Sequence, residues 1–262
     1  MLTVIKRLVL NVLPHKIKEW LRRERIKRAI RKGAFLAIDQ GHFTSSITRP
    51  MCIPADCQLW KERLSKPYGH EPQVVQWYER NLLMDDVLYD AGAHLGYYAA
   101  LSSSLQPGIS FHGFEGSWWM AEYFLLNKAR LDKSNRWHMT QKLVGDHDDD
   151  TFVSINNYIR THAVPTIFQM DVDGDEISVM RGASALLGNG ITIFIIETHP
   201  VDLVKRGKTV QEFLNFFDPG KYDLRYLPDL RADVSAWTER LDDAQLEDEF
   251  YTLAVPKGLS RF

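Results

Sequence analysis

Residues 87–98 read VLYDAGAHLGYY. A hydrophobic run ends at Asp90, and two glycines, Gly92 and Gly96, follow with His94 between them. This order is typical of a β-strand that ends in an acid and turns at once into a helix. The first backbone N–H groups of such a helix have no partner within it and favour a carboxylate or a phosphate. The stretch is therefore either an ordinary strand-to-helix turn or a turn that lets a ligand approach the backbone.

Strands and helices alternate from about residue 71 almost to the end of the chain. The runs TIFQMD and ITIFIIE are apolar on both faces, as strands covered by helices on both sides should be. The alternation predicts βαβ crossovers and an α/β fold, a doubly wound parallel sheet. The last two strands lack a clear crossover helix between them, so we expect an antiparallel hairpin at the edge. The predicted strands are 87–90, 109–115, 137–144, 166–171, 191–197, 222–227 and 250–256, and the predicted helices are 72–82, 95–105, 118–131, 152–161, 175–187 and 208–217.

The composition fits one sizeable hydrophobic core with an extension. The chain has 262 residues, of which 45% are hydrophobic and 25% are charged. We expect residues 1–70 to form a basic helix (15–32) and an irregular extension, and residues 71–262 to form the α/β domain.

The expected compartment is the reducing cytoplasm. Cys52 and Cys57 are too few for a disulfide framework, and their spacing matches no common zinc signature. The first residues do not resemble a signal peptide, because Lys6 and Arg7 interrupt the hydrophobic run and no small-x-small cleavage site follows Pro14. No stretch approaches the length of a transmembrane helix.

Four acids stand at the ends of four predicted strands: Asp90, Glu115, Asp171 and Glu197. In a doubly wound sheet, ligands bind beyond the carboxyl ends of the strands at the point where the strand order reverses. Packing alone does not explain acids at four such ends. We therefore expect these side chains to meet in one binding site.

Glu115 indicates which kind of ligand the turn accepts. It ends the strand after Asp90, where an acid meets the hydroxyls of a ribose. Nicotinamide dinucleotides and S-adenosylmethionine (SAM) both use this arrangement. The dinucleotide pattern G-x-G-x-x-G fails, because positions 94 and 97 are histidine and tyrosine. The residues Asp90, Gly92, His94 and Gly96 instead follow the acid-x-G-x-G-x-G pattern of SAM sites, with the middle glycine replaced.

Three segments resemble the FkbM-type methyltransferases: YDAGAHLGYY (89–98), FEGSWWMAEYFLLNKARL (114–131) and FQMDVDGDEISVMRGASALL (168–187). IIETHP (195–200) is similar to the family's strand that ends in an acid and a histidine. The resemblance spans roughly residues 71–256. It implies a Rossmann-like class I methyltransferase fold, with seven strands and an antiparallel last strand, and SAM as the cofactor. The chain departs from the family at His94, where asparagine is usual, and near Gln169, where the family has lysine.

Each residue around the turn has an expected role. Glu115 is expected to bind the ribose, and Asp90 to hold the turn or to reach the amino group of the cofactor. Asp146, after the third strand, is a candidate acceptor for the adenine amino group. Trp118 and Trp119 either flank the adenine or belong to the core. The candidate cofactor-binding residues are Asp90, Gly92, His94, Gly96, Glu115 and Asp146.

A second set of residues follows the two central strands and is the candidate catalytic group. Methyl transfer to a hydroxyl needs a group that removes the proton as attack proceeds, and His199 beside Glu197 and Asp171 supplies one. An alternative is a magnesium ion held by the oxygens of Asp171, Asp173 and Glu197. Asp175 is expected only to cap the helix that follows it.

The sequence leaves three hypotheses about the function open. The leading hypothesis is a SAM-dependent O-methyltransferase that acts on a small molecule or a glycan. A nucleic-acid methyltransferase is less favoured, because the chain has neither the Asn/Asp-Pro-Pro-aromatic motif of exocyclic-amine methylation nor a Pro-Cys nucleophile. The third is a non-catalytic, membrane-associated scaffold that keeps the cofactor-binding fold.

The N-terminal arm, residues 1–32, differs in charge from the rest of the chain. It holds eleven lysines and arginines and two glutamates, a net charge of +9, so the remainder carries −11. Aliphatic residues and Trp20 lie among these charges, as in helices that bind at a membrane surface. The alternative is that the apolar residues pack on the domain and the charges are solvated.

We predict that the N-terminal arm binds an anionic membrane face without spanning it. Each basic residue near an acidic leaflet adds about 1 kcal/mol to binding. The intact chain should therefore float with anionic vesicles in a salt-sensitive manner, whereas a chain without residues 1–32 should not. Equal recovery of both chains, or no preference for anionic over neutral vesicles, would leave the arm with a structural role only.

Overall fold

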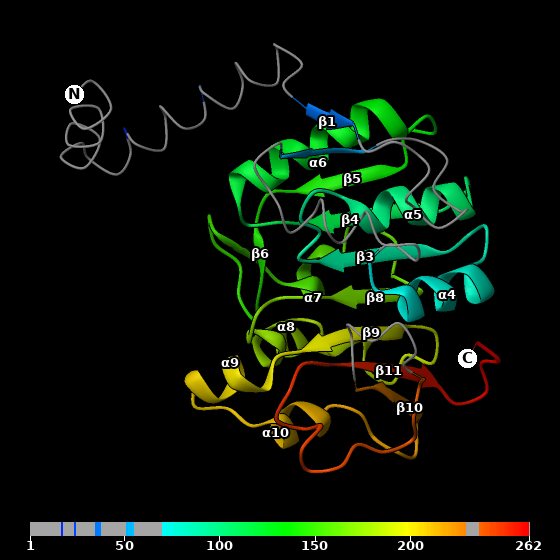
Figure 1. The fold of residues 1–262 in the computed structure, drawn as a ribbon, viewed down its shortest axis with the longest axis vertical. Coiled ribbons are helices and arrows are strands. Elements are labelled where there is room, and N and C mark those ends of the chain that lie inside the picture. The colour runs from blue at the N-terminus through cyan, green and yellow to red at the C-terminus, as the bar shows by residue number, and fades with distance from the viewer. Residues whose placement is uncertain are drawn as a thin grey trace.

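The computed structural model describes residues 17, 24, 35–37, 51–54, 70–228 and 236–261 (Figure 1). The predicted basic helix over 15–32 lies outside these residues, apart from residues 17 and 24. Within the described part of the chain, no helix is long and apolar enough to cross a membrane.

A seven-stranded mixed sheet forms the centre of the molecule, in the order β10-β11-β9-β8-β3-β4-β5 (Figure 1). Six strands run parallel, and β11 is antiparallel to both of its neighbours. All seven predicted strands occur, the third of them shortened at its end, and the antiparallel last strand is confirmed. The strands are β3 (Val87–Ala91), β4 (Ser110–Phe114), β5 (Trp137–Thr140), β8 (Ile167–Met170), β9 (Ile193–Thr198), β10 (Tyr222–Leu227) and β11 (Phe250–Pro256).

Helices cover both faces of this sheet, and successive strand residues point to opposite faces. Along β9, Ile193 and Ile195 pack under the first layer of helices, while Phe194 and Ile196 pack under the second. The first layer is α4 (Pro72–Asn81), α5 (Tyr97–Leu105) and α6 (Trp118–Leu131), and the second is α7 (Ile155–Tyr158), α8 (Glu176–Gly182), η2 (Ser184–Leu186), α9 (Pro200–Lys205) and α10 (Val210–Leu214).

Three element predictions are wrong in detail. The predicted strand 137–144 splits, because the chain turns after Thr140 and Leu143 pairs with Phe152, giving β6 (Leu143–Val144) and β7 (Phe152–Val153). The predicted helix 152–161 is therefore reduced to the single turn of α7. The predicted helix 175–187 breaks at Gly182, which packs so closely that a Cβ there would lie 1.8 Å from the carbonyl oxygen of Gly145. Helix α9 was not predicted.

Part of the predicted irregular extension packs on the sheet domain. Two short strands, β1 (Phe35–Ala37) and β2 (Cys52–Pro54), pair antiparallel. The backbone N–H of Cys52 donates to Asn127 Oδ1 at 2.6 Å, and Asn127 Nδ2 donates to the carbonyl of Cys52 at 3.1 Å. A buried side chain of α6 thus holds β2 in place.

Strand order places the ligand-binding edge between β3 and β8. From β3 the chain builds β4 and β5 on one side, and it then crosses back to build β8 and β9 on the other. The helices that leave β3 and β8 lie on opposite faces, so the carboxyl ends of these two strands border an open crevice. Asp90 and Asp171 come from these two ends.

Buried His112, on β4, makes stability depend on pH. It is 5% exposed, and it contacts the rings of Tyr89, His138, Tyr158 and His162. Burial, followed by the neighbouring histidines, lowers the pKa of His112 to about 3. Since the unfolded state binds this proton more readily, the neutral ring stabilises the fold above the unfolded pKa of about 6.5, and this contribution is lost as pH falls below it.

We predict that His112→Gln is less stable than the native chain at pH 7.5. The difference in free energy of unfolding between the two should become smaller by about 1–2 kcal/mol at pH 5. The narrowing arises because only the native chain must keep a buried imidazole neutral at the lower pH. Urea unfolding at the two pH values measures it. His147→Gln, at an exposed histidine, is the control and should show no such narrowing; a constant deficit for His112→Gln would contradict the assignment.

Candidate active site

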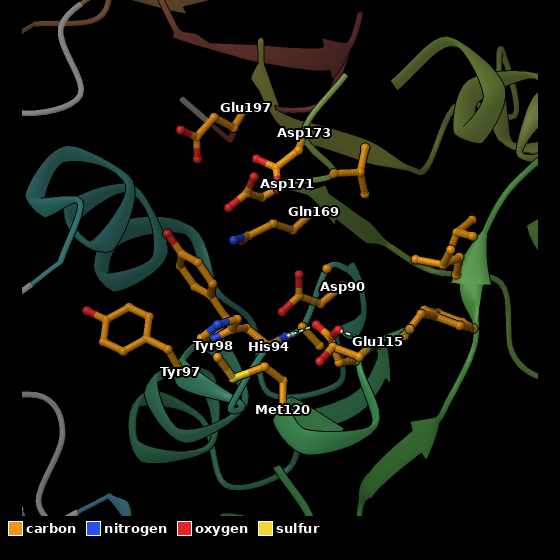
Figure 2. Close-up of a pocket in the computed structure, with 18 of the residues that line it drawn as sticks. Asp90, His94, Tyr97, Tyr98, Glu115, Met120, Gln169, Asp171, Asp173 and Glu197 are labelled. Carbon is orange, nitrogen blue, oxygen red and sulfur yellow. Dashed lines mark hydrogen bonds between the residues drawn. The ribbon is translucent and has the colours of Figure 1, made fainter. Parts of the chain in front are cut away.

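A cavity of about 570 Å³ opens at the carboxyl ends of β3, β4, β8 and β9 (Figure 2). This is the edge at which doubly wound sheets bind ligands, and the volume lies within the range of about 300–1,000 Å³ typical of ligand pockets. Among the described residues that line it there is no lysine or arginine. The lining instead includes eight acids: Glu71, Asp90, Glu115, Asp171, Asp173, Asp175, Glu197 and Glu249.

The turn after β3 forms the floor of the cavity. The backbone N–H groups of Gly92 and Ala93 both donate to the carbonyl of Phe114, at 2.9 and 3.0 Å. Gly92 has φ +92°, and a Cβ there would lie 1.9 Å from the carbonyl oxygen of Asp171. Only glycine allows β3 and β8 to approach this closely. The turn ends at Gly96, which also has a positive φ and precedes the first residue of α5.

Glu115 ties the end of β4 to the turn. Its Oε2 accepts from the backbone N–H of His94 at 2.9 Å, and its Oε1 accepts from the N–H of Ser117 at 2.6 Å (Figure 2). Burial raises the pKa of Glu115, and these two hydrogen bonds oppose that rise. A carboxylate has about four lone-pair sites. About two of these sites are therefore not occupied by the two N–H groups.

Asp90 lines the cavity and is only 2% exposed. Burial, followed by the charges of Asp171 and Glu115, raises its pKa well above the ordinary value. Beside it, Gln169 accepts a hydrogen bond from the hydroxyl of Tyr78 through Oε1. The amide nitrogen of Gln169 is left to face the cavity (Figure 2).

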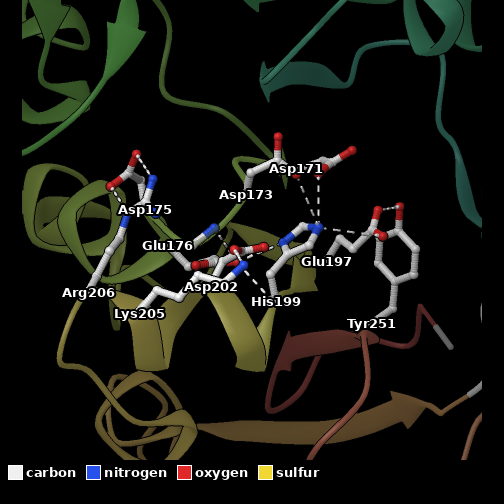
Figure 3. A network of polar contacts seen from close by, with 11 residues as sticks. Asp171, Asp173, Asp175, Glu176, Glu197, His199, Asp202, Lys205, Arg206 and Tyr251 are labelled. Carbon is white, nitrogen blue, oxygen red and sulfur yellow. Dashed lines mark hydrogen bonds and ion pairs between the residues drawn. The ribbon is translucent and has the colours of Figure 1, made fainter.

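His199 is held in one orientation by Glu176, a fully buried acid at the start of α8. Glu176 Oε1 accepts from the backbone N–H groups of His199 and Gly174, at 3.0 and 3.3 Å, and lies 2.9 Å from His199 Nδ1 (Figure 3). Because Oε1 already accepts both backbone N–H groups, it is the acceptor of this contact as well, and Nδ1 is the donor. His199 Nε2 therefore faces the cavity.

Three carboxylates surround His199 Nε2. Its distances are 3.5 Å to Asp171 Oδ1, 3.7 Å to Asp173 Oδ1 and 3.7 Å to Glu197 Oε1 (Figure 3). Burial lowers the pKa of His199, but the hydrogen bond to Glu176 and these charges outweigh it and raise the pKa to about 9. Burial raises the pKa of Asp171 to about 6. With no other cation present, the imidazole itself carries the positive charge of this group.

A second network joins Glu197 to Glu71, the residue before α4. The hydroxyl of Tyr251 lies 2.7 Å from Glu71 Oε2 and 3.0 Å from Glu197 Oε2. Glu71 also accepts from the hydroxyl of Tyr98, and its Oε1 lies 2.7 Å from His70 Nε2. A phenol has one proton and can donate to only one carboxylate. One of the two acids must therefore be protonated.

The environments of the two acids decide which one it is. Burial raises the pKa of Glu71, but His70 and the hydrogen bonds outweigh it and hold the pKa at about 2. Burial, followed by the charges of Asp171 and Glu71, raises the pKa of Glu197 well above its ordinary range. Glu197 is therefore the protonated acid: it donates to Tyr251, and Tyr251 donates to Glu71.

The structure brings most of the predicted site residues together, but not all. Gly96 lies behind the cavity wall, where a Cβ would meet the ring of Phe124 at 2.9 Å. Asp146 lies outside the cavity and pairs with His147 at 3.0 Å, because the chain has left the sheet before it. Trp119 lines the cavity and Trp118 does not. The predicted residues that line it are Asp90, Gly92, His94, Glu115, Asp171, Asp173, Glu197 and His199.

Several polar residues in and around the cavity could not be predicted from the sequence. Glu71 and Tyr251 reach Glu197 from distant parts of the chain, and no local pattern marks them. Glu176 did carry a signal, since it follows Asp175 in the segment that resembles the FkbM-type family. A first-turn acid is usually interpreted as a helix cap, however, and its complete burial is visible only in the structure.

The strand order and the antiparallel β11 define a Rossmann-like fold of the class I methyltransferase type. No protein-family profile and no curated protein matches the chain, so the resemblance to the FkbM-type family stays a prediction.

Solved structures with a similar fold include a methyltransferase FkbM from Methylobacillus flagellatus KT, with 16% identity, a TM-score of 0.48, and coverage of 67% of this chain and 47% of that chain. A putative rRNA methylase from Clostridium thermocellum has 14% identity and a TM-score of 0.49, and the match covers 70% of this chain and 93% of that one. A putative methyltransferase from Streptococcus mutans in complex with SAH has 8% identity and a TM-score of 0.47, covering 70% and 95%.

We predict that Gly92→Ala destabilises the protein by about 1–3 kcal/mol more than Gly190→Ala does. Gly190 also has a positive φ, +78°, but nothing lies within 4 Å of the Cβ that alanine would add. The control thus carries the backbone strain alone, about 1 kcal/mol, without the clash with Asp171. Urea unfolding of both variants measures the difference, and equal losses would show that the close approach of β3 and β8 does not depend on glycine.

Proposed function

We propose that the protein is a SAM-dependent methyltransferase that methylates a hydroxyl group of a small molecule or a glycan. The observation that carries the proposal is the junction of the turn after β3 with Glu115 at the switch point of the sheet. A close glycine turn at the start of a helix and an acid on the next strand suit a ribose attached to an amino-acid moiety.

The cavity has a chemical gradient that fits this cofactor. Trp119, Met120, Leu143 and Val144 line its β4 side, where an apolar wall suits an adenine ring. Acidic groups line the β8 and β9 side, where they suit the positive charges of a sulfonium and an ammonium group. When bound, SAM supplies a methyl group on a positively charged sulfur. Asp90 and Gln169 lie between the two sides, at the floor.

His199, Asp171 and Glu197 are the proposed catalytic group, because they lie together (Figure 3) on the β8 and β9 side of the cavity. There they would orient the acceptor hydroxyl, and Asp171, whose carboxylate is the unprotonated group of the three at neutral pH, would receive the proton as the new carbon–oxygen bond forms. Methyl transfer is an in-line displacement in which positioning does most of the work. The contacts between Glu176 and His199 keep the imidazole in the fixed orientation that such positioning requires.

The charge of the cavity also bears on the acceptor. Eight acids and no lysine or arginine occur among the described lining residues, so a phosphate-rich acceptor would be repelled. This favours a neutral or cationic small molecule, or a glycan, over a nucleic acid.

Turnover distinguishes an enzyme from a non-catalytic scaffold. An enzyme releases S-adenosylhomocysteine (SAH) in the presence of its acceptor, and a scaffold does not.

We predict that SAM and SAH bind the chain and that Glu115→Ala weakens binding by about 1–3 kcal/mol, because charge-assisted hydrogen bonds to the ribose are lost. Isothermal titration measures the affinities of SAM and SAH for the native chain and for the variant. Asp146→Ala is the control, since that side chain lies outside the cavity, and its affinity should be unchanged. A thermal melt of each variant checks that the fold is kept. No heat with SAM or SAH, together with clear binding of a nicotinamide cofactor, would overturn the proposal.

A further inference from the structure

Three side chains at the edge of the cavity have the spacing of metal ligands. One atom each from Asp171, Asp173 and His199 lies within 4.8 Å of the others. His199 Nε2 is 3.5 Å from Asp171 Oδ1 and 3.7 Å from Asp173 Oδ1. Ligand atoms that bind one ion at about 2.0–2.2 Å stand roughly 3–3.6 Å apart. The cluster therefore needs only a small contraction to enclose an ion.

His199 provides a second observation, independent of the acids. It is 5% exposed, and its nearest neighbours at Nε2 are carboxylate oxygens at 3.5–3.7 Å, beyond the 2.7–3.2 Å of a good hydrogen bond. The nitrogen thus points between the acids and is not bonded to any one of them. A buried ring nitrogen in this position is directed at the place where an ion would lie.

Glu176 completes the arrangement that metal-binding histidines commonly have. A histidine that binds a metal through one nitrogen usually donates its other N–H to a carboxylate or a carbonyl, which fixes the ring and makes it a better ligand. Here Nδ1 meets Glu176 Oε1 at 2.9 Å, and Glu176 is fully buried. The interaction orients the ring from within the core.

We propose that Asp171, Asp173 and His199 bind a divalent transition-metal ion of the series from manganese to zinc. An imidazole with two carboxylates suits these ions, whereas magnesium and calcium prefer oxygen ligands throughout. The set differs from the predicted magnesium ligands, because His199 replaces Glu197. Glu197 Oε1, 3.7 Å from His199 Nε2, is close enough to contact a water molecule on the ion.

The ion would bind where the acceptor hydroxyl is expected, and it would ease loss of the hydroxyl proton by polarising the oxygen. This role rests on the proposed function, but the binding of the ion does not. The two ideas can therefore fail separately. Isothermal titration of SAM into the metal-free chain tests the proposed function. Metal binding in the absence of SAM and of an acceptor tests the proposed ion site.

The experiment titrates Mn²⁺ into the full, chelator-treated chain and follows the EPR signal of the free ion. We expect one ion per chain and binding at least about 10-fold weaker in His199→Ala and Asp173→Asn, with Glu176→Gln weakened by about 10–100-fold as a positioning residue. Asp173 is 88% exposed, so its substitution should not affect folding. Asp175→Asn is the matched control, because Asp175 pairs with Arg206 at 2.9 Å and should leave Mn²⁺ binding unchanged.

Three outcomes would overturn the proposal. The first is no binding of Mn²⁺ to the native chain. The second is equal binding by the native chain and by both His199→Ala and Asp173→Asn. The third is displacement of Mn²⁺ by an equal concentration of Mg²⁺, which would contradict the assignment to a transition-metal ion. Zn²⁺ competing more strongly than Mg²⁺ would support it.

Discussion

The contact between Gly92 and the backbone of Asp171 is the constraint on which the site depends. The backbone N–H of Asp171 donates to the carbonyl of Ala91 at 2.9 Å, and the absent side chain of Gly92 lets the two chains touch just beyond the strands. Because β3 and β8 stay together up to this point, Asp90 and Asp171 share one cavity. With a side chain at position 92 the crevice would open at its floor, and the acids would separate into water.

Repulsion among so many acids lowers the stability of the fold, and three arrangements in the structure reduce this repulsion. Glu71 is ionised because His70 and two tyrosine hydroxyls bind it. Glu197 takes the opposite state and keeps its proton, which lets it donate to Tyr251. The imidazole of His199 then offsets the charge of Asp171. Groups arranged in this way favour a cationic occupant, because any positive charge that enters replaces a proton that the protein now holds.

The sequence predicts the position of a site residue correctly where that position follows from the end of a strand. Parallel strands end at one edge, so acids at the ends of β3, β4, β8 and β9 were expected to meet, and Asp90, Glu115, Asp171 and Glu197 all line the cavity. It fails where position depends on packing. Asp146 is misplaced because the chain leaves the sheet after Thr140, and Glu71 and Tyr251 are brought to Glu197 only by tertiary structure.

The two polar networks share Glu197, and this connects the cavity to the first helix of the domain. On one side Glu197 faces His199, and on the other it reaches Glu71, at the start of α4, through Tyr251. Glu71 itself has a left-handed backbone, φ 53°, a conformation that costs about 1 kcal/mol or more in a residue with a side chain. The surrounding hydrogen bonds offset that strain. A positive charge near His199 would favour loss of the proton from Glu197, and Tyr251 would then lie between two ionised acids. Its single proton cannot satisfy both, so the contact that holds the start of α4 is coupled to the charge in the cavity.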